Sequence, residues 1–177
     1  MDKLRVEHPL ANQSAITLPD LVVRVPSQPN LTELRGGLEF HRHPLFGCLP
    51  DEPGRARDLD GWRACWLRPD GWLLIDVPGA ALARDAFLQV ADSKLCRLLD
   101  LSHSLCCINF AGAAARELLA CGTPLDLRPV LFGPGQCTRT RCAEFTVLLD
   151  HRADGIDVYV DISLAYAFWA WIEDAVH

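Results

Sequence analysis

The sequence predicts an α+β protein in which an antiparallel sheet is built of β-hairpin–helix units. Half of its 177 residues are hydrophobic and 23% are charged, which is enough apolar material for one domain with a core. From residue 61 onward, short β-prone segments come in pairs around turn residues, and each pair precedes a segment with helical spacing. Strands that come as hairpins with helices between them are typical of an antiparallel sheet covered by helices.

The first 58 residues are rich in proline, which fixes φ and lacks a backbone donor, so no long helix fits there. We expect one short strand at 21–25. The rest of 1–58 is expected to be a proline-rich N-terminal arm that becomes ordered on partners. The α+β domain then covers 59–177.

The first unit begins with a strand at 62–67. Arg68-Pro69-Asp70-Gly71 is typical of a turn, because proline and glycine supply the dihedrals that a turn needs. A return strand is expected at 72–77. A helix follows from about Ala80 to Ala91.

The second unit is predicted to be a hairpin of strands 95–100 and 105–110 around the turn 102–104. A helix is expected at about 111–121. Gly122 and the following Pro124 are typical of a helix C-terminus.

The third unit follows the loop 132–136. A long strand is expected at 142–151, and the Asp154-Gly155 pair indicates a hairpin turn into a strand at 156–160. The last helix is expected at about 163–175, with Asp161 or Ser163 as its N-cap.

Charge and motifs exclude several classes of function. With 17 basic and 23 acidic residues, the chain has a net charge of −6 and is not attracted to nucleic acid. No apolar run resembles a signal peptide or a membrane span, so we expect a cytoplasmic protein with no membrane partner. Dinucleotide, phosphate-loop and serine-nucleophile motifs are absent from the sequence.

Eight cysteines are unusual for a chain of this length. The cytosol keeps thiols reduced, and the spacings do not match the paired ligands of zinc sites. We therefore expect core or near-surface thiols. They are Cys48, Cys65, Cys96, Cys106, Cys107, Cys121, Cys137 and Cys142.

The best metal candidate is His41 with His43 and Cys48, because residues i and i+2 of a strand face the same way. A structural or surface role is favoured, since no second ligand pair is evident, and no metal site is predicted. His103 and His151 fall at turn and strand ends, where exposure is expected.

Four carboxylates are candidates for acid–base chemistry, which requires environments that split their pKa values. Each lies at the end of an element or on a phase expected to face solvent, where carboxylates cap helices and keep a surface soluble. No catalytic residue is predicted. The four are Asp126, Asp150, Asp157 and Asp161.

The last helix is crowded with aromatic side chains. A helix that is apolar over so wide an arc is buried on two sides or faces a partner, and large aromatics dominate interface energetics. The candidate partner interface is Tyr166, Phe168, Trp169 and Trp171.

Several ordered segments resemble one family. They include a Leu-Arg-Pro-Asp-Gly-Trp-Leu-Leu hairpin, an Asp-x-Ser element, an Ala-rich helix that leads into Pro-Leu-Asp-Leu-Arg-Pro, and a Gly-Pro-Gly loop. The last segment is a strand that ends in Asp-Ile-Ser and is followed by a helix that contains a tryptophan. These segments are 67–74, 100–103, 114–129, 132–137 and 157–163 with Trp169.

The set resembles the γ subunits of heterotetrameric sarcosine oxidase and related N-methylglutamate dehydrogenase complexes. The resemblance implies a fold like the folate-binding domain of aminomethyltransferases. It also implies a non-catalytic accessory role beside α, β and δ subunits in a complex that oxidatively demethylates an N-methyl amino acid. The complex would carry FAD, FMN, NAD and zinc and use tetrahydrofolate, whereas this chain would bind no cofactor.

Two alternatives stay open. A stand-alone folate or one-carbon binding protein related to aminomethyltransferase would share the fold, although 177 residues is about half the length expected of such an enzyme. A metal-binding or redox module would use the segment 41–48 or the thiols.

Overall fold

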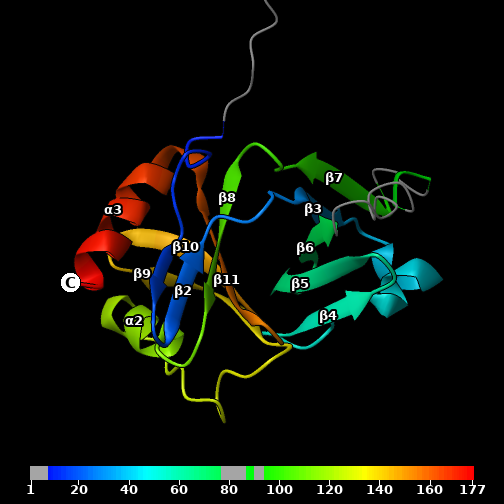
Figure 1. The fold of residues 1–177 in the computed structure, drawn as a ribbon. Helices are drawn as coiled ribbons and strands as arrows, with labels where there is room; N and C mark the ends of the chain where they lie inside the picture. Colours follow the sequence, from blue (N-terminus) through cyan, green and yellow to red (C-terminus); the bar gives the residue numbers. More distant parts are fainter. Residues whose placement is uncertain (1–7, 77–86, 90–93) are drawn as a thin grey trace, which may run out of the picture.

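The computed structural model describes residues 8–76, 87–89 and 94–177. They form two antiparallel sheets that pack against each other, with two helices on the outer face of the first sheet (Figure 1). No described helix has the length and apolar content that a membrane crossing requires.

The first sheet has six strands in the order β1-β2-β8-β11-β10-β9, and each neighbouring pair is antiparallel. Its central strands β8 and β11 are buried on both faces, because helices cover one face and the second sheet covers the other. The bounds are β1 Ile16–Leu18, β2 Leu21–Arg24, β8 Leu105–Ala111, β9 Cys137–Cys142, β10 Phe145–Arg152 and β11 Gly155–Asp161.

The second sheet has five strands in the order β4-β5-β6-β3-β7. Two short 3-10 helices, η1 (Phe40–Arg42) and η2 (Pro44–Cys48), lie between β3 and β4 in the chain and contribute to its outer core. The strand bounds are β3 Asn30–Gly36, β4 Ala56–Leu59, β5 Trp62–Arg68, β6 Gly71–Asp76 and β7 Cys96–Asp100.

The helices of the first sheet are α2 (Ala115–Gly122) and α3 (Ala165–Ala175), and the 3-10 helix η3 (Ile162–Leu164) leads into α3. The Asp161 carboxylate caps η3 by accepting a hydrogen bond of 2.9 Å from the Ser163 backbone N–H. This is the N-cap expected from the sequence, but regular α-helix begins at Ala165.

The period of two along each strand divides the core into three layers. The helix-covered layer joins one face of the first sheet to α2 and α3 and contains Ile108, Leu149 and Val158. The inter-sheet layer lies between the two sheets and contains Leu73 and Tyr159 among others. The third layer covers the outer face of the second sheet.

The segment predicted as an N-terminal arm differs from the structure over residues 16–59, which supply β1, β2, β3 and β4 to the two sheets. The prolines do not prevent this, because Pro19 lies between β1 and β2 and Pro26 lies between β2 and β3, where no ladder donor is needed. Only β2 was expected.

The second unit is not a hairpin. Strand β7 pairs with β3 in the second sheet, whereas β8 pairs with β2 and β11 in the first. The residues between them carry the chain from one sheet to the other, and Ser102 Oγ accepts a hydrogen bond of 3.0 Å from the Leu31 backbone N–H there. The prediction was wrong because a hairpin turn and a corner between sheets use the same turn residues.

The strand predicted at 142–151 begins three residues later, as β10, and the strand β9 before it was not predicted. Strands β9 and β10 form a hairpin whose turn lies at Ala143 and Glu144, with Ala143 at a φ of 52°. Alanine rarely adopts positive φ, so the sequence carries no signal for this turn. The helix predicted at about 80–91 lies outside the described residues except for 87–89.

Candidate functional site between the two sheets

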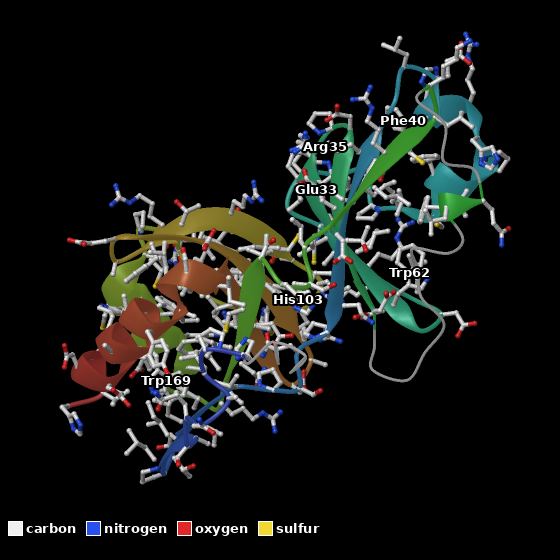
Figure 2. The ribbon with its side chains drawn as sticks, turned by 90° about the horizontal axis from the view of Figure 1, so that it is seen from above. Glu33, Arg35, Phe40, Trp62, His103 and Trp169 are labelled. Atoms are coloured by element: carbon white, nitrogen blue, oxygen red, sulfur yellow. The ribbon has the colours of Figure 1, made fainter. Side chains whose placement is uncertain are left out.

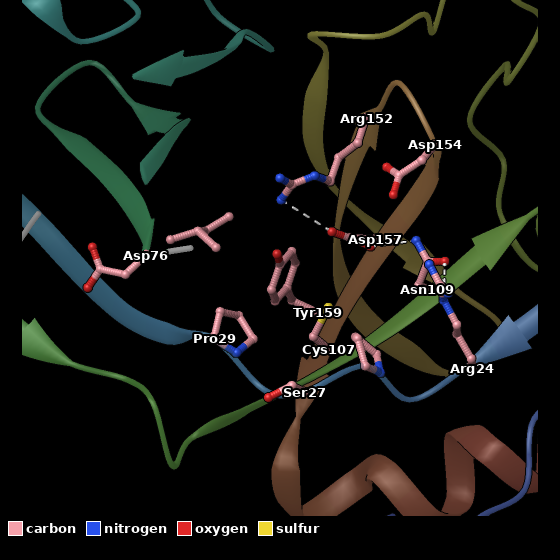
Figure 3. A pocket seen from close by; sticks show the side chains of 12 residues that line it. Arg24, Ser27, Pro29, Asp76, Cys107, Asn109, Arg152, Asp154, Asp157 and Tyr159 are labelled. Carbon is pink, nitrogen blue, oxygen red and sulfur yellow. Dashed lines mark hydrogen bonds and ion pairs between the residues drawn. The ribbon is translucent and has the colours of Figure 1, made fainter. Parts of the chain in front are cut away.

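A cleft with a volume of about 280 Å³ opens at one end of the inter-sheet layer (Figure 3). One wall is formed by β8, β11 and the hairpin turn that follows β10. The other is formed by the end of β6 and the segment 25–29, which carries the chain from the first sheet to the second.

The segment 25–29 is held in place by Gln28. Its amide Nε2 donates to the Cys107 carbonyl oxygen at 3.1 Å, and the Cys107 N–H donates back to Gln28 Oε1 at 2.7 Å. The side chain thereby continues the pairing along β8 beyond the end of β2. Pro26 and Pro29 restrict φ on either side of Gln28.

A chain of polar contacts crosses the floor of the cleft. Arg24 Nε donates to Asn109 Oδ1 at 3.2 Å, and Asn109 Nδ2 donates to Asp157 Oδ1 at 2.8 Å. The other Asp157 oxygen lies 3.5 Å from Arg152 Nη1. Burial raises the pKa of Asp157, and the hydrogen bond from Asn109 offsets part of that rise.

Tyr159 stands in the middle of the cleft (Figure 3). Its side chain is buried, and its hydroxyl has no hydrogen-bond partner among the described residues. Burial raises the pKa of this phenol well above its ordinary value. A buried hydroxyl without a partner is costly, so this atom is an unusual feature of the layer.

Deeper in the same layer, a buried ion pair joins the two sheets. Arg63 of β5 donates through Nε and Nη2 to the two Asp150 oxygens of β10, at 2.8 Å each, and through Nη1 to Asp58 at 2.8 Å. Burial opposes the charge of Arg63, but the contact with Asp150 raises its pKa overall. This bidentate pair fixes how the two sheets sit against each other.

The expectation that four carboxylates face solvent is wrong for two of them. Asp150 is fully buried and Asp157 is 8% exposed, because the second sheet covers the face on which both lie. Asp126 and Asp161 are exposed as predicted. Nothing in a single alternating strand reveals that a second sheet covers its polar face.

The His41 and His43 pair does not lie on a strand. His41 belongs to η1, and His43 Nδ1 accepts a hydrogen bond of 3.3 Å from the Leu45 N–H at the start of η2. The described residues contain no group of three or more ligand side chains arranged for a metal ion. The Cys48 thiol donates to the Leu45 carbonyl oxygen at 2.9 Å.

His103 is exposed as expected, but His151 is 7% exposed and stacks on Phe132 with ring centroids 5.6 Å apart. Its Nε2 lies 3.2 Å from Arg116 Nη2. Burial and the charge of Arg116 lower the pKa of this imidazole.

Only one of the four aromatics predicted as a partner interface is largely exposed. Phe168 and Trp169 are buried in the helix-covered layer, and Trp171 is half-buried against Phe168. Figure 2 shows Trp169 on α3, at the end of the molecule away from the second sheet. Tyr166 is 60% exposed and remains a candidate for contact with a partner.

The eight cysteines, all within the described residues, are free thiols. Six are buried, Cys48 is half-buried and Cys121 is exposed. The prediction of core or near-surface thiols is confirmed.

Comparison with known proteins supplies the relationship that the cleft alone does not. Residues 61–177 match the sarcosine oxidase, gamma subunit family. The chain belongs to that family. The sarcosine oxidase subunit gamma of Corynebacterium sp. (strain P-1) is 34% identical over 102 residues, which cover 57% of this chain and 50% of that protein. The chain thus spans about half the length of such a gamma subunit.

Solved structures confirm the fold expected of a gamma-family chain. A chain of the heterotetrameric sarcosine oxidase from Corynebacterium sp. U-96, in complex with pyrrole 2-carboxylate, superposes with a TM-score of 0.76. The identity is 24%, over 88% of this chain and 83% of that one. Glycine cleavage system aminomethyltransferase T from Bartonella henselae gives 0.61 and 18% identity, over 86% of this chain and 45% of that one. The aminomethyltransferase-like fold is therefore confirmed.

Proposed function

We propose that this chain is a non-catalytic accessory subunit of an oxidoreductase complex that oxidatively demethylates an N-methyl amino acid. The observation that carries the proposal is the family match across residues 61–177. The complex would be of the sarcosine oxidase or N-methyl amino acid dehydrogenase type and would act in the cytoplasm. Its α, β and δ subunits would carry FAD, FMN, NAD and zinc, and it would use tetrahydrofolate.

The chemistry of the inter-sheet layer supports an accessory role. Arg63 is engaged by Asp150 and Asp58, and Asn109 is engaged by Arg24 and Asp157. These groups bind one another across and along the sheets, which is what a rigid scaffold requires. A general acid or base would instead need to reach a substrate proton.

The outer face of α3 is our candidate for the contact with a partner. Tyr166, in the first turn of α3, is 60% exposed, and Leu164, the last residue of η3, is 41% exposed. An exposed tyrosine offers a large apolar ring with a polar tip, the kind of side chain that interface hot spots use.

Co-purification tests the proposal. This chain is tagged, expressed with the products of neighbouring genes and captured, and the eluted chains are weighed by mass spectrometry. We expect flavin-bearing chains in equal ratio to the tagged one. A folded, monodisperse chain that elutes without them would overturn the proposal.

A matched pair of variants locates the contact. Tyr166→Ala should reduce the yield of captured partners, whereas Leu99→Ala should not, because Leu99 is 50% exposed on β7 of the second sheet, away from α3. Equal yields from the two variants would exclude the outer face of α3 as the contact.

Folate binding by this chain alone is the second candidate, favoured by the structural likeness to aminomethyltransferase T. The cleft volume of about 280 Å³ lies just below the roughly 300–1,000 Å³ of pockets that hold drug-sized ligands, so it would enclose only part of a folate. Titration calorimetry with tetrahydrofolate decides it. Heat that saturates at one equivalent would favour this candidate over the accessory role.

A further inference from the structure

The cleft presents charges of both signs within a small volume. Arg152 and Asp157 lie 3.5 Å apart, which is longer than the roughly 2.7–2.9 Å of a charge-assisted hydrogen bond. Their side chains are partly shielded from solvent, at 28% and 11% exposed. The pair is therefore loosely joined, and each member keeps hydrogen-bonding capacity for another group.

The Tyr159 hydroxyl points into the space beside this pair (Figure 3). As an O–H group it can donate to a carboxylate, and burial keeps it protonated because its pKa is raised. A ligand group at this place would satisfy a polar atom that the protein leaves without a partner.

Apolar surface completes the cleft opposite these groups. Pro29 and Ile75 line the facing wall, and the Tyr159 ring forms the base. The cleft's volume of about 280 Å³ equals about nine waters at roughly 30 Å³ each, so it suits a ligand of about nine non-hydrogen atoms.

We propose that this cleft binds a small amino-acid zwitterion. The ligand's carboxylate accepts hydrogen bonds from Arg152 and the Tyr159 hydroxyl, its ammonium group lies against Asp157, and its side chain packs on Pro29 and Ile75. The zwitterion can insert between Arg152 and Asp157 and still give each of them an oppositely charged neighbour. A simple anion would face Asp76, Asp154 and Asp157, and a simple cation would face Arg152 and Arg24.

The hydrogen bonds around Asp157 support this orientation of the ligand. Asn109 donates a hydrogen bond to Asp157, and Arg24 donates one to Asn109. The Asp157 carboxylate therefore keeps its orientation when a ligand binds. Gly155 allows the adjacent hairpin turn to lie close to β8: it has a φ of +147°, and a Cβ there would lie 2.5 Å from the Phe110 carbonyl oxygen. Arg152 pairs with Gly155 across that turn, which sets the place of its backbone.

Ligand-observed saturation-transfer NMR on the full chain tests the proposal, with glycine, N-methylglycine and proline as probes. Acetate carries only the negative charge of an amino acid and methylamine only the positive one, and both serve as comparison ligands. We expect at least one amino acid to bind at millimolar concentration and to displace the others, with both half-ligands weaker. Saturation transfer from none of the amino acids, or equal transfer from acetate alone, would overturn the proposal.

Matched variants assign the binding to the cleft. Arg152→Gln should weaken binding by about tenfold or more, since a hydrogen bond to a charged group is lost. Arg97→Gln on the exposed edge strand β7 should leave it unchanged. Tyr159→Phe should weaken binding about threefold while the chain stays folded by circular dichroism.

Unchanged affinity in both cleft variants would place the ligand elsewhere and contradict the proposal. The titration needs no partner subunit, so its result is distinguishable from that of the co-purification.

Discussion

The two faces of the first sheet bury different chemistry. Leu149 and Asp150 are neighbours on β10, and both are fully buried, yet Leu149 packs under the helices whereas Asp150 binds Arg63 of the second sheet. The helix-covered layer is mainly apolar, with His151 and Arg116 beside Phe132 at its margin. The inter-sheet layer mixes apolar side chains with ionised groups and an unpaired hydroxyl.

This difference separates stability from specificity. The apolar layer stabilises any arrangement that removes it from water, because the hydrophobic effect has no direction. The polar layer accepts only the arrangement in which Arg63 meets Asp150, since an unpaired buried charge is costly. We therefore infer that the helices stabilise the fold and that the ion pair fixes how the sheets are docked.

The largest effect is expected from Asp150→Ala. It leaves the Arg63 guanidinium, 2% exposed, without its main partner, and we expect a loss of about 3–5 kcal/mol in the free energy of unfolding. Urea denaturation followed by tryptophan fluorescence measures it. The double variant Arg63→Met with Asp150→Leu is the control and should cost much less. A single variant as stable as the double one would contradict the role assigned to the pair.

Leu149→Ala should cost about 3 kcal/mol, through lost burial and the cavity left in the helix-covered layer. Since no charge is involved, the cost should be the same in low and high salt. Denaturation at two salt concentrations checks this. A strong salt dependence for Leu149→Ala would abolish the distinction between the layers.

Tyr159→Phe should stabilise the chain by about 1 kcal/mol, because it removes a buried hydroxyl that has no partner. Its melting temperature, measured without ligand, should therefore exceed that of the native chain. A lower melting temperature would mean that the hydroxyl is satisfied within the folded protein.

A smaller, pH-dependent effect is expected from His151, whose pKa is lowered by burial and by Arg116. Its folded pKa lies below its ordinary value of about 6.5, so the unfolded chain binds the proton first as the pH falls. The stability contribution is complete above that value and is lost as the pH drops through the folded pKa.

The comparison of two histidine variants isolates this contribution. His151→Gln should flatten the pH dependence of the melting temperature between neutral and mildly acidic pH. His103→Gln, at an exposed position, should not. Parallel curves for the native chain and His151→Gln would show that another group titrates in this window.

The sequence was sufficient for elements with strong local signals. The Asp154-Gly155 turn, the β5–β6 hairpin and the Asp161 cap were all predicted, because each depends on a few adjacent residues. The bounds of strands that are flanked by turn residues were also predicted to within a few residues of the observed ones.

The candidate site could not be predicted, because it depends on long-range packing. Asp150 and Asp157 alternate with apolar neighbours as solvent-facing residues would, and only the second sheet buries them. Likewise, β3 has few local strand signals and is a strand because β6 and β7 bind both of its edges. Arg63, which pairs with Asp150, lies 87 residues away from it in the chain, so local spacing could not bring the two together.

Hydrogen–deuterium exchange of this chain, alone and with the flavin-bearing chains of the proposed complex, tests the accessory role most directly. The account predicts slower exchange in peptides that cover 164–171 when the partners are present, with unchanged protection at the β5–β10 contact that is already fixed within the chain. Identical exchange in every peptide, with and without partners, would contradict it.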